Sequence, residues 1–212
     1  MSVVAPVLGV VAAVLGVIEV LPYVRDTLRR STRPHRGTWF IWAVLAGVAF
    51  WAHRADGASW SLLLLGVECV GTAVVFALSL RWGHGALTTA ERRLVLLAGV
   101  GVVGWVVTDE PLVALACVIA SDLVATSMML PKTWRNPASE TLSTYVMASA
   151  GGAAAAASIG VTAVPSSASV GVGAASLLAY PVYFCLINGA VAAVLVVRRR
   201  AALVPVSLRV LA

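Results

Sequence analysis

Three acidic residues lie inside long apolar runs of the sequence: Glu19, Glu68 and Asp122. A carboxyl group inside a membrane-spanning helix is costly, so it usually faces the interior of the helix bundle and marks a functional site. Glu68 and Asp122 have no basic residue in their own runs, whereas Glu19 lies within two turns of Arg25 and can instead pair with it. In apolar surroundings such an acid can stay neutral and donate a proton. We therefore take all three as candidate catalytic acids.

Aromatic side chains gather near the second and the last of the apolar runs. An aromatic face stabilises a cation by up to about 2 kcal/mol once water is excluded, although such residues often serve only to pack a bundle or to mark the membrane interface. The candidate substrate-binding residues are Trp39, Trp42, Tyr145, Tyr180, Phe184 and Asn188. Small residues fill the stretch 148–157, which predicts close contact with another helix or room for a ligand.

Other chemistries find no support in the sequence. No glycine-rich phosphate-binding loop of the Walker type is present, and the three cysteines lack the spacing of zinc ligands. Lys132 is the only lysine, and we expect it in a cytoplasmic loop, which excludes a Schiff base within the bundle. His35, His53 and His84 stand apart from one another near the ends of predicted helices. We therefore expect neither a metal nor a cofactor.

The composition is that of a chain solvated by lipid. Of 212 residues, 60% are hydrophobic and 11% are charged, against about 25% charged in a soluble domain, and the mean hydropathy is +0.96. The net charge of +6 resides in short segments between apolar runs rather than on a basic helix face with interleaved aromatics. That distribution argues against nucleic-acid binding. The expected partners are membrane lipid and an apolar small molecule.

Seven apolar runs predict seven membrane-spanning helices. A span needs about 20 residues, so two short runs are extended: the second back to Pro34, and the fourth back to Thr88, which forms a capping-box pattern with Glu91. The runs are approximately 3–21, 38–53, 59–80, 93–107, 111–130, 138–163 and 171–197.

The distribution of basic residues predicts the orientation of these helices. If the first connecting segment is cytoplasmic, all basic residues except Arg54 fall on the cytoplasmic side. Positive residues are retained on that side of bacterial membrane proteins. We therefore expect a multi-pass protein of the bacterial cytoplasmic membrane, with its N-terminus outside and its C-terminus in the cytoplasm.

A weak internal repeat divides the predicted bundle. The offset that places Glu19 on Asp122 also places Pro34 on Pro137, Thr38 on Thr141 and Trp42 on Tyr145. It predicts an all-α protein in a 3+1+3 arrangement, with parallel repeats related by an axis along the membrane normal. The expected parts are a first three-helix unit (1–81), a connector helix (82–108), a second three-helix unit (109–200) and a short cytoplasmic tail (201–212).

The 3+1+3 plan, the outside N-terminus and a proline that ends the first helix before a basic segment resemble the PQ-loop/SWEET superfamily of seven-helix membrane proteins. The chain departs from that superfamily at its signature, having Pro22-Tyr23 and Pro131-Lys132 where Pro-Gln is usual, and it has few interior prolines other than Pro181. The resemblance implies a fold more than an activity.

Two functions fit these observations. In size, helix number and intramembrane acids the chain is similar to small heptahelical membrane terpene cyclases, which implies proton-initiated cyclisation of an isoprenoid by a buried acid in an aromatic-lined apolar cavity. The alternative is a transporter of the PQ-loop/SWEET type, with Glu68, Asp122 or Asn188 contacting a small solute or a proton. A receptor or an assembly factor is a third class. We favour the enzyme, because acids among aromatics with few polar partners suit a proton donor better than a sugar site.

Overall fold

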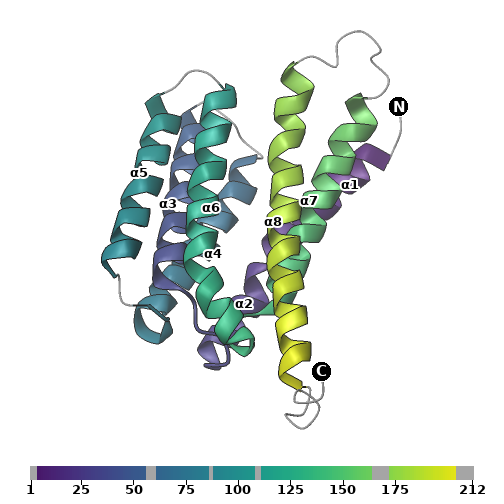
Figure 1. Ribbon diagram of the computed structural model, residues 1–212. Coiled ribbons are helices and arrows are strands. Elements are labelled where there is room, and N and C mark those ends of the chain that lie inside the picture. Colours follow the sequence, from purple (N-terminus) through teal and green to yellow (C-terminus); the bar gives the residue numbers. More distant parts are fainter. Residues whose placement is uncertain (1–3, 56–60, 86–87, 108–110, 164–171, 204–212) are drawn as a thin grey trace.

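The computed structural model describes residues 4–55, 61–85, 88–107, 111–163 and 172–203, and its regular elements are all helices (Figure 1). These are α1 (Val4–Ile18), α2 (Val20–Leu28), α3 (Arg36–Ala55), α4 (Ser61–Trp82), α5 (Thr89–Val107), α6 (Pro111–Arg135), the 3-10 turn η1 (Pro137–Ser139), α7 (Leu142–Ala163) and α8 (Val172–Leu203). Since only Glu19 separates α1 from α2, these two form one bent rod. The described residues thus contain seven helical rods.

The bend between α1 and α2 lies one turn before Pro22. Proline has no N–H, so the carbonyl of Ile18 loses its helical partner and is crowded by the proline ring. Glu19 still donates its main-chain N–H to the carbonyl of Leu15 (3.0 Å), and the hydroxyl of Thr144 on α7 donates to the carbonyl of Glu19 (2.9 Å). The bend therefore follows from Pro22, and it holds Glu19 against α7.

The rods pack as two groups joined along a central seam. α4 packs against both α3 and the α1–α2 rod, and α8 packs against both α6 and α7. Across the seam α1 contacts α7, and α3 contacts α6, while α5 packs on the outside against α6 and α3. The two groups are thus α1–α4 and α6–α8. The view in Figure 1 does not separate them, because it places α3 to α6 at the left and α1, α7 and α8 at the right.

Four described helical segments are long and apolar enough to cross a membrane: residues Val4–Leu28, Leu115–Arg135, Leu142–Gly160 and Leu178–Ala202. Arg36–Phe50 is a shorter apolar helix. Many large apolar side chains point away from the core, such as Leu96 and Val100 on α5 and Leu186 on α8, which suits a lipid environment. The chain is a helical membrane protein with several candidate spans.

Most predicted helices are found where they were expected, with several differences in their bounds. The first rod, expected to end at 21 before Pro22, continues through that proline to Leu28, and α8 continues to Leu203 rather than to 197. The α3 helix begins at Arg36 rather than at Pro34, and the helix expected from 138 begins at Leu142, after the η1 turn. Lys132, expected in a loop, lies in the last turn of α6 and is buried. The capping box that opens α5 is confirmed: Thr88 donates its N–H to Glu91, and Glu91 donates its N–H to the Thr88 hydroxyl.

The start of α3 is tied to the segment that follows α4. The N–H of Arg36 donates to the carbonyl of His84 (3.1 Å), and the N–H of His84 donates to the carbonyl of Pro34 (2.8 Å). The His35 ring lies 3.0 Å from the Glu91 carboxylate. Burial lowers the pKa of His35, and the hydrogen bond to Glu91 acts in the opposite direction. The three segments thus meet in one polar joint at this end of the bundle.

The backbones of α7 and α8 approach closely at Gly152. A Cβ atom at this glycine would lie 2.7 Å from the nitrogen and 3.0 Å from the Cα of Cys185. One turn away, the hydroxyl of Ser149 donates to the carbonyl of Cys185 (2.9 Å). A small residue is therefore required where these helices cross, which is the usual way that helices pack in membranes.

We predict that Gly152→Ala destabilises the protein by about 1–3 kcal/mol, because its methyl group meets backbone atoms that cannot turn away. Gly151→Ala is the matched control, since its Cβ would lie 3.5 Å from Leu15, an ordinary contact distance. Thermal unfolding of the two variants in detergent measures the difference. Equal midpoints for the two variants would contradict the close approach of α7 and α8.

Candidate functional site

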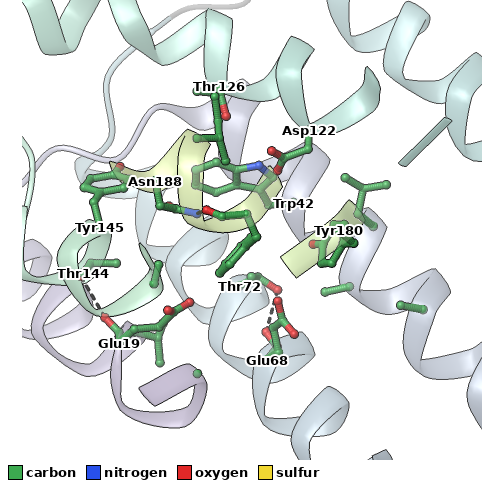
Figure 2. A pocket seen from close by; sticks show the side chains of 18 of the residues that line it. Glu19, Trp42, Glu68, Thr72, Asp122, Thr126, Thr144, Tyr145, Tyr180 and Asn188 are labelled. Atoms are coloured by element: carbon green, nitrogen blue, oxygen red, sulfur yellow. Dashed lines mark hydrogen bonds between the residues drawn. The ribbon is translucent and has the colours of Figure 1, made fainter. Parts of the chain in front are cut away.

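A cavity of about 690 Å³ lies between the two groups of helices. Its walls come from every described α-helix except α5. All nine candidate site residues line it: Glu19, Trp39, Trp42, Glu68, Asp122, Tyr145, Tyr180, Phe184 and Asn188. Figure 2 shows most of these side chains around one central space. The structure therefore brings together candidate residues as far apart in the sequence as Glu19 and Asn188.

The lining of the cavity is mostly apolar, and its only charged residues are acidic. Apart from Glu19, Glu68 and Asp122, the polar side chains come from threonines, tyrosines and one asparagine, and none of the described residues that line the cavity is a lysine, arginine or histidine. The rest of the wall is aliphatic or aromatic. Such a cavity suits a largely apolar ligand that is oriented by a few polar groups.

Asp122 on α6 is already supplied with a hydrogen-bond donor. The hydroxyl of Tyr183 on α8 donates to its carboxylate at 2.5 Å. The indole of Trp42 lies beside the same carboxylate in Figure 2 without completing a hydrogen bond of good geometry. Asp122 is thus arranged as an acceptor.

Glu19 and Glu68 differ from Asp122, because no donor holds their carboxyl groups. The Oε2 atom of Glu19 is buried and has no hydrogen-bond partner among the described residues. The polar contacts that the structure shows at Glu68 involve its main-chain carbonyl, which accepts from the hydroxyl of Thr72 (2.9 Å). Glu68 lies near enough to Glu19 and to Asp122 to interact electrostatically with each. Two carboxyl groups are therefore available to a ligand.

Aromatic rings form two sides of the cavity. Trp39 and Trp42 on α3 meet edge to face with centroids 5.0 Å apart, and Tyr180 and Phe184 on α8 stack with centroids 5.9 Å apart. Asn188 donates its amide to the carbonyl of Phe184 (2.9 Å), so part of its hydrogen-bonding capacity is used within α8. Aromatic rings of this kind can stabilise a cationic centre by their π faces.

The end of the cavity nearest the connecting segments rests on a buried ion pair. Lys132 at the end of α6 pairs with Glu140, which precedes α7, and both are buried. The hydroxyl groups of Tyr23 (2.8 Å) and Tyr145 (3.0 Å) both donate to Glu140 Oε2, and the indole N–H of Trp39 donates to the hydroxyl of Tyr23 (3.2 Å). The polar atoms of Trp39 and Tyr145 are therefore bound in this ion-pair cluster.

The ion-pair cluster also joins the two groups of helices. Lys132 donates to the carbonyl of Arg33, which lies before α3, and Arg199 on α8 donates to the carbonyl of Glu140. The hydroxyls of Thr32 and Thr141 lie 2.6 Å apart, and Arg33 donates its N–H to the carbonyl of Ser139 (2.9 Å). These contacts fasten this end of the bundle.

Four of the polar residues around the site were not among the candidates: Tyr23, Lys132, Glu140 and Tyr183. One signal was available in the sequence. Glu140 is one of few acids in segments that are otherwise basic, and it lies close to the only lysine. Such a pair indicates a structural ion pair even where its burial is not evident.

Comparison of the chain with protein families, with curated proteins and with solved structures finds no match.

We predict that breaking the buried ion pair is more harmful than removing it. Lys132→Met or Glu140→Gln alone should destabilise the protein by about 3–5 kcal/mol, because each leaves a buried partner uncompensated. The double variant should lose less than the sum of the two. Equilibrium unfolding in mixed micelles provides the double-mutant cycle.

Arg25→Gln is the control for this cycle, because the Arg25 side chain is 58% exposed and its pair with Asp26 lies at the surface. Its effect should stay below about 1 kcal/mol. Additive losses for Lys132 and Glu140 would show that the two groups do not act as a pair.

Proposed function

We propose that the protein is an integral-membrane cyclase that protonates a linear isoprenoid substrate within the cavity. The observation that carries this proposal is that three carboxyl groups and five aromatic side chains face one mostly apolar cavity of about 690 Å³. Cyclisation started by a proton needs an acid, exclusion of water, and groups that stabilise a carbocation. All three requirements fit this lining.

The unpartnered acids have the role of proton donor. Glu68 or Glu19 transfers its proton to a carbon–carbon double bond of the substrate, which forms a carbon–hydrogen bond and a carbocation. A second double bond attacks the cation and closes a ring. Asp122, held as an acceptor by Tyr183, then takes a proton from the final cation. The product is an isomer of the substrate, so no oxidant or cofactor is consumed.

The aromatic side chains stabilise the cationic intermediates. Trp39, Trp42, Tyr180 and Phe184 line the cavity from α3 and α8. The ion-pair cluster keeps the nucleophilic tyrosine oxygen of Tyr145 bound to Glu140. A carbocation in the cavity then meets π faces and carboxylates rather than water, which would otherwise trap it as an alcohol.

We further propose that all seven rods span the bacterial cytoplasmic membrane with the N-terminus outside, in two three-helix units joined by α5. The α2–α3 connection, η1 and the C-terminal end of α8 lie at one end of the bundle in Figure 1, and the basic residues gather there. In both groups the third helix lies between the other two. This packing supports the parallel repeat and the PQ-loop/SWEET-like fold.

The second candidate function is transport of a small solute, coupled to a proton. The observation that favours it is the place of the cavity, which lies between the two helix groups and is reached by helices from both. Movement of one group against the other would expose such a site to alternate sides of the membrane. Glu68, Asp122 and Asn188 would then contact the solute or the proton.

Membranes that contain the protein, incubated with a linear prenylated substrate, test the cyclase. The wild type should form a cyclised isomer, and Glu68→Gln or Asp122→Asn should lower its rate by about 10²–10⁴-fold. Leu186→Ala is the matched control, because Leu186 on α8 is 66% exposed and does not line the cavity. Absence of product from the wild type, together with acid-dependent solute uptake by vesicles, would replace the enzyme with the transporter.

A further inference from the structure

A positively charged ligand would be bound most favourably next to the two carboxyl groups of the cavity to which no hydrogen-bond donor points, those of Glu19 and Glu68. We propose that the protein binds lipophilic ammonium ions in the cavity, with the charged nitrogen between Glu19 and Glu68 and the apolar chain along the aliphatic wall. Such an ion imitates a cationic intermediate of cyclisation, so the inference deepens the proposed function and rests on it for that meaning.

The sign of the charge follows from the lining. Among the described residues, the ionisable groups of the lining are Glu19 on the bend, Glu68 on α4 and Asp122 on α6, together with Tyr145 and Tyr180. No basic side chain in the lining neutralises them. Once one of these acids has transferred its proton, the carboxylate that remains repels an anionic ligand and is left without a partner by a neutral one. A cation supplies the missing charge.

The place of the charge follows from the hydrogen bonds. Asp122 accepts a hydrogen bond from Tyr183, whereas Glu19 Oε2 is buried and has no hydrogen-bond partner among the described residues. Burial of an unpaired polar atom costs about 1–3 kcal/mol, and more when it is charged, so a cation that offsets the charge of the carboxylate gains affinity even without an N–H to donate. Glu68 lies across from Glu19 in Figure 2, with Tyr180 at its side. The gap between the two glutamates is therefore the strongest cation position.

The kind of cation follows from the shape of the site. Within the described residues, no three His, Cys, Asp or Glu side chains converge as the ligands of a metal ion would. The cavity is far larger than a metal ion, and the rings of Tyr180 and Phe184 border it. A quaternary ammonium group has a diffuse charge that suits aromatic faces and spaced carboxylates. The remaining volume then takes a hydrocarbon chain.

The probe that tests the inference is a trimethylammonium ion that carries one linear isoprenoid chain. Its neutral partner has a tert-butyl group in place of the trimethylammonium group, so size and chain are the same. Binding to the full-length protein in nanodiscs of zwitterionic lipid is measured by calorimetry and by the shift in thermal unfolding. The ammonium ion should bind at least about tenfold more tightly than its neutral partner.

The variants locate the charge. Glu19→Gln and Glu68→Gln should each weaken ammonium binding by about tenfold while leaving binding of the neutral partner unchanged. Asp122→Asn should weaken it less than either, and Leu186→Ala should not change it. The thermal midpoints of the ligand-free variants show that each is folded. Equal affinity for the two probes, or an Asp122→Asn loss as large as that of Glu68→Gln, would overturn the inference.

The two proposals fail separately. Charge-selective binding that depends on Glu19 and Glu68, without any cyclised product from a neutral substrate, would uphold the cation position and remove the cyclase. A cyclised product without preference for the ammonium probe would uphold the cyclase and remove the cation position.

Discussion

The buried pair of Lys132 and Glu140 is the interaction on which the arrangement of the site depends. Bringing two charges out of water is costly, and the cost is offset only when the remaining donors and acceptors are also satisfied. Here they are: Tyr23 and Tyr145 donate to the carboxylate, and Lys132 also donates to the carbonyl of Arg33. Because these groups come from four different segments, satisfying one ion pair fixes the relative positions of α2, α3, α6 and α7. The same bonds turn the polar atoms of the cavity rings toward the cluster.

The polar groups of the bundle interior therefore fall into two regions, the ion-pair cluster and the cavity. In the ion-pair cluster, acids and bases are matched and hydrogen-bonded. In the cavity above it, the charged groups are all acids, and Glu19 Oε2 has no partner. A fully satisfied network gives rigidity, whereas unsatisfied groups next to an open volume are a feature of ligand sites. The rigid cluster supports the cavity, and the bend at Pro22 connects the two by holding Glu19 at the edge of the cavity.

The helices and most residues of the cavity lining were predictable from the sequence, each for its own physical reason. Glu68 and Asp122 stand out because lipid-facing helices are otherwise apolar, and an acid in such a run has to face inward. The helix bounds follow from hydropathy, and the start of α5 from the Thr88–Glu91 capping box. Lys132 and Glu140 were not found, because a charged residue near a helix end has the same sequence signature whether it faces water or a partner. Tyr183 likewise resembled one more packing aromatic, since its bond to Asp122 joins residues far apart in the chain.

The contacts at the connecting-segment end also distinguish what the two candidate functions require of the fold. Opening the cavity to that side would have to separate Thr32 from Thr141, Arg33 from Ser139 and Tyr23 from Glu140. A transporter would break these bonds and remake them in every cycle, with a buried ion pair exposed each time. A cyclase needs them to stay intact, because water that entered would trap the carbocation.

The two helix groups also differ in the side chains that line the cavity, although a transporter built from a repeat would have to move the two groups in similar ways. α3 presents Trp39 and Trp42 to the cavity, whereas α7 presents one aromatic ring, Tyr145, beside Ala148 and is packed by Gly152 directly against the backbone of α8. The fastened end of the bundle and the different linings of the two helix groups therefore favour the cyclase, which needs a cavity of constant shape, over the transporter.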